Sequence, residues 1–290
     1  MGVRQQKNLE WKNMMLRCLL QGSPKGDNVT RWMHSAVEGS TLEWVTDWLA
    51  GKTDRTPIMF WGMLRGAETA MNFCLDWDHP FYIADHAYFH GGHKGEKSHY
   101  RITKNWPQSR NIDIRRADRF NKLDIEIKDW NLGGDYILVC PPGDGVKKIF
   151  GVETWTERVI SEIEKRTDRR IEIRTKPNQP SYTVRNGIGI PIWDTDYTKK
   201  QPPISEHIDG AQAVVTHTSN VAVEAIIRGK PVFCSLYSAA APMASGDDYG
   251  FYSIEDPIRK DRIAWLNHLA YSQFTVEEIK DGTAWSILND

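Results

Sequence analysis

The sequence predicts an α/β protein in which strands and helices alternate to build two domains. The clearest support is the stretch AVVTHTSNVAVEAIIRGKPVFC at residues 213–234, which reads as strand, polar turn, helix and strand. A second observation is the alternation of strand-like and helix-like segments from residue 135 onwards, which is typical of a parallel, doubly wound sheet. The third observation is the length of 290 residues, which favours two domains over one.

The second domain is expected over residues 131–257, with its elements in a regular order. Residues 213–215 are small or β-branched, the composition of a buried strand. Apolar residues at helical spacing follow the polar turn, and Gly229 stands where a C-cap glycine would end that helix. Upstream, the pattern predicts a strand with a glycine-rich turn, an amphipathic helix and another strand, at 135–145, 154–167 and 169–177.

The first domain is expected over residues 1–130 and begins with helical segments at 8–20 and 40–51. In the second of these segments Ser40 is the expected N-cap, and Glu43 would complete a capping box. Residues 56–77 read as strand, glycine turn and helix, which is the opening of a Rossmann-like unit.

Three further segments complete the expected fold. Residues 81–84 form a short strand, and alternating apolar and charged residues at 121–130 predict a half-exposed strand. The tail, 258–290, reads as two helices that would pack back across both domains. The predicted fold class is therefore α/β, with two Rossmann-like domains facing each other across a cleft and with helical N-terminal and C-terminal segments.

Composition describes an ordinary soluble protein, with 40 % hydrophobic and 26 % charged residues. No apolar run is long enough to cross a membrane, and the polar N-terminus lacks the core of a signal peptide, so a cytoplasmic location is expected. The four cysteines are far apart, which argues against a zinc site or a disulfide framework. We expect no metal and no tightly bound cofactor.

Three turns of the second domain carry the residues expected to bind a ligand. Ligands of open α/β sheets bind beyond the carboxyl ends of the strands, where these turns would meet. Glycine lets the backbone approach a ligand closely, cations neutralise a phosphate, and a polar turn before a helix offers N–H and hydroxyl groups. Each feature also has a purely structural explanation, such as helix capping. The residues are Gly143, Gly145, Arg174, Lys176, His217, Thr218, Ser219 and Asn220.

The segment HTSNVAVEAIIRGKPVF resembles the donor-binding motif of GT-B glycosyltransferases, in particular the bacterial capsule and lipopolysaccharide type. The resemblance is one of pattern and covers about residues 134–235. It implies a nucleotide-sugar donor, with UDP as the expected nucleotide, whose diphosphate binds Thr218, Ser219 and Asn220. It also implies that Glu224 contacts a hydroxyl of the donor, and that Arg174 or Lys176 neutralises the leaving phosphate without a metal.

The first domain would then hold the acceptor, although its sequence departs from the family pattern. Sugar transfer with inversion needs a base that takes the proton of the acceptor hydroxyl. Asp85 at a strand end is the first candidate, with His86 beside it, and the alternative is that Asp85 only caps a turn. Residues expected to contact the acceptor or a phosphate are Gly62, Arg65, His90, Lys94, Lys97, Arg101 and Lys104.

The acceptor and the reaction class stay open at this point. Residues 94–122 hold nine basic and three acidic residues interleaved with aromatics, a composition that can bind nucleic acid. The acceptor is accordingly a glycan, or DNA that carries a hydroxymethylated pyrimidine, with the glycan favoured by the resemblance. The alternatives are a sugar-nucleotide 2-epimerase of the same fold, with Asp85 and Glu224 as its acids, and a non-catalytic protein that binds nucleotides or nucleic acid.

Overall fold

The structure is a computed structural model that describes residues 15–51, 54–90, 98–109, 112–175, 182–185, 188–191 and 203–290. The chain divides into two compact units, each with an α/β architecture. Unit 1 comprises residues 1–109, 114–123 and 266–290, and unit 2 comprises residues 110–113 and 124–265. The domain boundaries at 130 and 257 expected from the sequence stay predictions.

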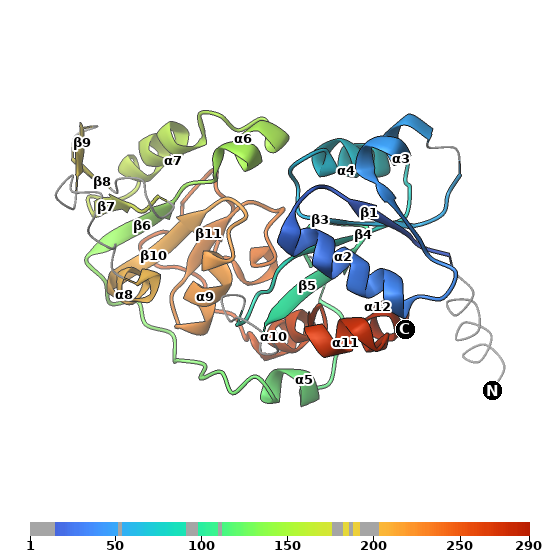
Figure 1. The fold of residues 1–290 in the computed structure, drawn as a ribbon. Helices are drawn as coiled ribbons and strands as arrows, with labels where there is room; N and C mark the ends of the chain where they lie inside the picture. Colours follow the sequence, from blue (N-terminus) through green and yellow to red (C-terminus); the bar gives the residue numbers. More distant parts are fainter. Residues whose placement is uncertain are drawn as a thin grey trace. The chain divides into compact units, whose positions relative to one another are not determined.

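Unit 1 is built on a six-stranded sheet with the order β12-β5-β4-β3-β1-β2 (Figure 1). Four neighbouring strands, from β4 to β2, are parallel, and the remaining two pair antiparallel at one edge. The strands are β1 (Arg17–Leu20), β2 (Thr41–Trp44), β3 (Ile58–Trp61), β4 (Phe81–His86), β5 (His99–Lys104) and β12 (Gln273–Thr275). The helices are α2 (Pro24–Ala36), α3 (Val45–Gly51), α4 (Ala67–Asp76), α5 (Asp118–Asn121), α11 (Val276–Lys280) and α12 (Thr283–Leu288).

Helices cover both faces of this sheet, α3 and α4 on one side and α2, α11 and α12 on the other (Figure 1). Side chains alternate between the faces along each strand. Met59, Tyr82 and Ile102 therefore join one core cluster with Met33 of α2 and Trp285 of α12. Burial of both faces explains why the central strand β3 and the first four residues of β4 are continuous apolar runs.

Unit 2 repeats the same arrangement in a sheet with the order β11-β10-β6-β7-β8-β9. Its first four strands are parallel, and the last two pair antiparallel at the opposite edge. The strands are β6 (Tyr136–Cys140), β7 (Arg170–Ile173), β8 (Tyr182–Arg185), β9 (Ile188–Pro191), β10 (Ala211–Thr216) and β11 (Val232–Cys234). The helices are α6 (Asp144–Phe150), α7 (Trp155–Glu164), α8 (Ile204–Gly210) and α9 (Val221–Ile227), followed by a short 3₁₀ turn at Ala241–Met243.

In unit 2, α6 and α7 lie on one side of the sheet, and α8 and α9 lie on the other (Figure 1). Val139 and Val215 face Trp155 and Val159 of α7 in one core cluster. The strand, turn, helix and strand predicted at 213–234 are confirmed as β10, α9 and β11. Gly229 has φ +76°, the left-handed conformation of a residue that follows a helix C-cap.

The helix predictions for the first fifty residues need correction. Residues 17–20 form the parallel strand β1 rather than the end of a helix, and residues 8–14 lie outside the described part. The segment at 40–51 divides into strand β2 and helix α3. Ser40 caps no helix there, because its hydroxyl donates to the carbonyls of His34 and Val37, at 2.9 and 2.7 Å.

Two later predictions are also wrong. Residues 124–130 alternate between half-buried and exposed as expected, but they pair with no strand. Instead they run along the end of α9, where Lys128 N donates to Ile227 O and Asn131 N donates to Gly229 O, at 2.9 and 2.8 Å. The tail holds three helices and a strand instead of two helices, since α10 (Ile263–Ala270) is followed by β12, α11 and α12.

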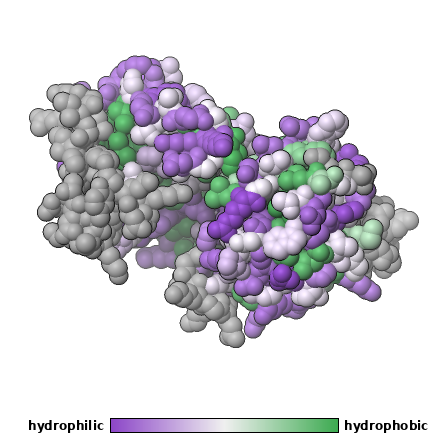
Figure 2. All heavy atoms as spheres, turned by 45° about the horizontal axis from the view of Figure 1, so that its top comes forward, coloured by the Kyte–Doolittle hydropathy of each residue, from purple (hydrophilic) through white to green (hydrophobic). Residues whose placement is uncertain are grey.

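The face drawn in Figure 2 carries hydrophilic residues over much of its area, with hydrophobic residues in separate patches. Within the described residues, every helix is too short or too polar to cross a membrane.

Candidate functional site

The carboxyl edge of the unit 2 sheet brings the predicted turns together. In the parallel register Cys140 lies beside Thr216, and Thr216 lies beside Cys234. Thr216 Oγ1 donates to Cys140 O at 2.7 Å, and Arg174 N donates to Val139 O at 2.8 Å. The turns after β6, β7 and β10 therefore begin at the same level of neighbouring strands. The expected convergence of these turns at one edge of the sheet is confirmed.

The turn between β10 and α9 is shaped by its own backbone. Ser219 Oγ accepts a hydrogen bond from Val221 N at 3.3 Å, and Ser219 O accepts one from Ala222 N at 3.1 Å. Asn220 occupies the N-cap position, but its side chain does not cap the helix. The Ser219 side chain is exposed and Thr218 is half-buried. This turn presents hydroxyl groups at the carboxyl edge.

His217 lies behind this turn rather than on its surface. The residue is 3 % exposed, and its ring packs against Phe150 and Trp155, with centroids 5.1 and 6.4 Å away. Burial lowers the pKa of the imidazole, which outweighs the attraction of Asp248. Nδ1 has no hydrogen-bond partner among the described residues. The structure therefore places His217 in the wall that supports the turn.

Arg174 and Glu224 bring opposite charges to the same edge. Arg174 follows β7, and its Nη1 donates to Nδ1 of His207 at 3.2 Å. Burial, together with the Arg174 charge, lowers the pKa of His207 to about 4, so this imidazole is neutral at pH 7. Burial likewise lowers the pKa of the half-buried Arg174 guanidinium.

Glu224 is a half-buried carboxylate within α9. Burial raises the pKa of Glu224, and Arg228 and Arg174 oppose this rise without cancelling it. The carboxylate makes no hydrogen bond or ion pair with the residues that the structure describes. A desolvated carboxylate with unused acceptor positions is suited to bind the hydroxyl groups of a ligand.

The glycine turn after β6 is the start of a helix. Gly143 is the N-cap residue of α6, and Gly145 lies in the first turn of that helix. Gly143 has φ −72° and ψ 161°, a conformation that any residue adopts, so its backbone geometry does not require glycine. Lys176, the second cation expected here, lies outside the described residues.

In unit 1, the two residues predicted to act in catalysis end strand β4. Asp85 Oδ2 accepts a hydrogen bond from Arg101 Nη2 at 2.7 Å, and Asp85 Oδ1 accepts one from the backbone N–H of His86 at 2.7 Å. His86 is exposed and packs edge-on against Trp61, with ring centroids 5.5 Å apart. The Asp85 carboxylate is therefore held in an ion pair.

Arg101 was predicted to contact acceptor or phosphate, and the structure buries it. The residue is 3 % exposed, its Nη1 donates to Gln108 Oε1 at 2.9 Å, and its guanidinium lies 5.3 Å from the Tyr88 ring. A cation so enclosed stabilises unit 1 and is not part of a charged surface. Lys94 and Lys97 lie outside the described residues.

The four remaining unit 1 candidates that the structure describes make separate contacts. Gly62 directly follows β3, has φ +59° and donates its N–H to Ala84 O at 2.7 Å. Arg65 also has a positive φ, and its Nη1 donates to Gly22 O at 3.1 Å. Lys104 Nζ donates to Asn289 Oδ1 at 3.0 Å. His90 has φ +56° and lines a pocket of its own unit.

Sequence reasoning missed the role of Lys230. This residue is 1 % exposed, and its Nζ donates to Gly133 O at 2.9 Å. The same region is held by Arg262, which donates from Nη1 to Ile226 O at 2.6 Å and from Nη2 to Lys128 O. Because lysine is rarely buried, no local pattern in the sequence indicated this position.

The described residues contain no cluster of three or more His, Cys, Asp or Glu side chains that could hold a metal ion. No family model matches the chain, and no curated protein matches it. Solved structures that resemble it include the β-Kdo 2,4 transferase of KpsC from Thermosulfurimonas dismutans, at 12 % identity and a TM-score of 0.49. That match covers 90 % of this chain and 92 % of the other.

A second solved structure is the β-Kdo 2,7 transferase of KpsC from the same organism, at 15 % identity and a TM-score of 0.49. It covers 93 % of this chain and 98 % of the other.

Proposed function

We propose that this protein is a glycosyltransferase whose nucleotide-sugar donor binds at the carboxyl edge of the unit 2 sheet. The observation that carries the proposal is that three turns begin at the same level of the neighbouring parallel strands β7, β6 and β10. Arg174, the turn at residues 218–220 and Glu224 belong to the segments that follow β7 and β10. A diphosphate needs a cation and hydrogen-bond donors, whereas a sugar or ribose needs acceptors for its hydroxyl groups. This edge offers both kinds of group.

Each residue then has a distinct task in the proposed reaction. Arg174 neutralises the nucleoside diphosphate that leaves, and Ser219 with Thr218 hydrogen-bonds the phosphate oxygens. Glu224 accepts hydrogen bonds from a hydroxyl of the donor. Because Glu224 already lies half out of water, a bound hydroxyl supplies a partner that its surroundings lack.

Unit 1 supplies the acceptor side of the proposal. A base must remove the proton of the acceptor hydroxyl, and the candidates stay Asp85 and His86. Asp85 is held in an ion pair with Arg101 at 2.7 Å, whereas His86 is exposed. If Asp85 is the base, Asp85→Asn should abolish transfer and leave donor binding intact. If transfer continues in this variant, His86 is the residue that removes the proton.

For the acceptor, we propose a glycan hydroxyl rather than DNA. Among the cations that the structure describes between residues 94 and 122, Arg101 pairs with Asp85, Arg119 forms a bidentate pair with Glu278, and Lys104 donates to Asn289, all inside unit 1. A nucleic-acid surface needs cations that are open to solvent. A transfer assay with glycan and hydroxymethylated DNA acceptors in parallel separates the two possibilities.

The donor site is tested by thermal shift with UDP, other nucleoside diphosphates and their sugars. A ligand that binds only the folded state raises the melting temperature. We expect one diphosphate to raise it for the wild type, and Ser219→Ala and Glu224→Gln to reduce that rise. Glu157→Gln, an exposed carboxylate of α7, is the matched control and should respond like the wild type. An equal rise in all variants would contradict the donor site.

A further inference from the structure

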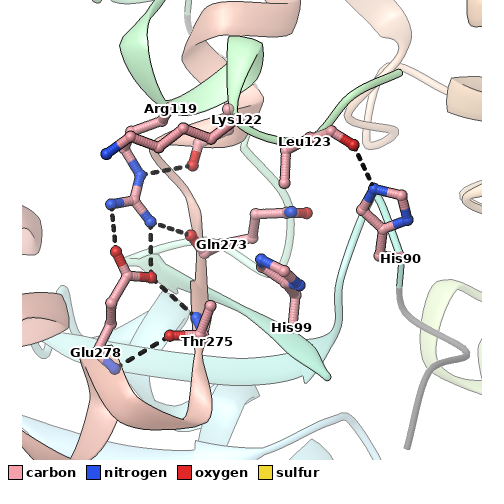
Figure 3. A pocket seen from close by; sticks show the side chains of 9 residues that line it. His90, His99, Arg119, Lys122, Leu123, Gln273, Thr275 and Glu278 are labelled. Carbon is pink, nitrogen blue, oxygen red and sulfur yellow. Dashed lines mark hydrogen bonds and ion pairs between the residues drawn. The ribbon is translucent and has the colours of Figure 1, made fainter. Parts of the chain in front are cut away.

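A pocket in unit 1 is formed by residues that take no part in the proposed donor site. This open pocket has a volume of about 310 Å³ and lies between α5, β5, β12 and the start of α11 (Figure 3). Since one water occupies about 30 Å³ in the liquid, this volume corresponds to roughly ten waters. A space of that size accommodates a small organic molecule. The question is which chemistry its walls select.

Glu278 is the carboxylate among the described residues that line the pocket, and both of its oxygens already accept hydrogen bonds from the protein. Glu278 accepts two hydrogen bonds from Arg119, at 2.6 and 3.0 Å, and one from Thr275 N at 2.9 Å. Burial opposes ionisation of Glu278, but these hydrogen bonds outweigh it and lower the pKa of the carboxyl. The Arg119 guanidinium is equally occupied, because it also donates to the carbonyls of Ala270 and Gln273. This pair forms a neutral, rigid side of the pocket.

The groups left for a ligand are hydrogen-bond donors. Gln273 is 1 % exposed, and its Oε1 accepts a hydrogen bond from Phe89 N at 2.9 Å. This hydrogen bond sets the orientation of the side-chain amide, so Nε2 lies on the side away from Phe89 N. That Nε2 has no partner in the described part of the chain. In Figure 3 the Gln273 side chain extends between His99 and Leu123. A buried donor without a partner is costly, so a ligand oxygen at this place would be stabilising.

A lysine lines the same pocket. Lys122 is the exposed C-cap residue of α5, and the rings of His90 and His99 lie with their centroids 6.1 Å apart. His90 Nε2 donates to Leu123 O at 2.8 Å, which holds that ring at the wall. With the Glu278 charge neutralised by Arg119, the pocket has net positive charge and donor groups.

We propose that this pocket binds a small organic molecule through its anionic group, a carboxylate or a phosphate, which accepts a hydrogen bond from Gln273 Nε2 and is attracted by the charge of Lys122. Apolar wall atoms of Leu123 and Ala270 contact the rest of the molecule. The proposal does not depend on the donor site, since every residue named belongs to unit 1.

The test uses three probes of similar size that differ in charge: glucose 6-phosphate, glucuronate and neutral glucose. Isothermal titration calorimetry of the full chain should show binding of at least one anionic probe and none of glucose. Gln273→Glu keeps the bond from Phe89 N and places a carboxylate oxygen at the Nε2 position, so binding should be lost. Lys122→Gln changes an exposed residue, removes the lysine charge that attracts the anion and should weaken binding about tenfold.

Lys25→Gln, which removes an exposed lysine of α2 outside the pocket, is the matched control and should bind as the wild type does. Preference for the phosphate or for the carboxylate probe identifies the anion, and either preference supports the proposal. Absence of binding by both anions up to about 10 mM, or unchanged binding in Gln273→Glu and Lys122→Gln, would overturn it.

Discussion

Gly229 is the residue at which the structure makes its sharpest quantitative prediction. A Cβ added there would lie 1.9 Å from Asp129 O and 2.8 Å from Asp129 C, far inside the contact distance of about 3.3 Å for carbon and oxygen. Asp129 cannot retreat easily, because Lys128 and Asn131 on either side of it donate to the end of α9. Gly229 also has φ +76°, which disfavours any side chain.

The cost of Gly229→Ala is the sum of these two effects. The left-handed conformation costs alanine about 1–2 kcal/mol, and forcing an extra carbon into a packed site costs about 1–3 kcal/mol. We therefore expect a loss of about 2–5 kcal/mol in the free energy of unfolding of unit 2. Gly151→Ala is the matched control, since Gly151 has φ +62° at the end of α6 with nothing within 4 Å.

Urea unfolding followed by circular dichroism measures both variants. Gly151→Ala should lose only the conformational part, about 1–2 kcal/mol. If Gly229→Ala is no less stable than Gly151→Ala, the packing of residues 128–131 against α9 is not as described.

Three further predictions follow from named contacts. Glu224→Gln should be more stable than the wild type at pH 8, because the raised pKa of the half-buried carboxyl makes its ionised form unfavourable in the folded protein. This difference in the free energy of unfolding should vanish as the pH falls below the ordinary pKa of 4.5. Urea unfolding at several pH values measures it, and a difference that stays constant with pH would disprove the prediction. Asp85→Asn leaves the buried Arg101 without its charge partner and should cost about 3 kcal/mol, measured by urea unfolding, whereas an unchanged midpoint would mean that the ion pair contributes nothing. Thr275→Ala removes the capping box of α11 and should cost about 1 kcal/mol; a melting temperature equal to that of the wild type would show that this cap is dispensable.

Patterns within one segment were sufficient to predict the βα units. The elements at 56–77 and 213–234 were predicted correctly because apolar periodicity, glycine turns and helix ends are local properties. Helix α2 was missed although Ser23 accepts from Gly26 N and Pro24 opens the helix, a recognisable start signal. Strand β1 could not be predicted as readily, because its parallel pairing with β2 and β3 determines its conformation.

The candidate donor site was more predictable than the unit 1 pocket. Its residues follow β6, β7 and β10, which are neighbours in the sheet, so the topology of a parallel sheet alone brings them together. The pocket assembles residues from four separate segments, and its key contact joins Phe89 to Gln273, 184 positions apart. The burial of Arg101 was hidden for the same reason, because no local pattern distinguishes a lysine or arginine on the surface from one that pairs inside the fold.

The attachment of residues 128–133 to α9 has a mechanical consequence. Three groups hold the chain there: the backbone around Gly229, the Lys230 ammonium and the Arg262 guanidinium. Helix α9 has seven residues and is therefore about 10 Å long, with the Ser219 turn at its other end. A displacement of residues 128–133 would therefore act on the C-terminal end of α9. The turn at which we propose the donor binds lies at the N-terminal end of the same short helix.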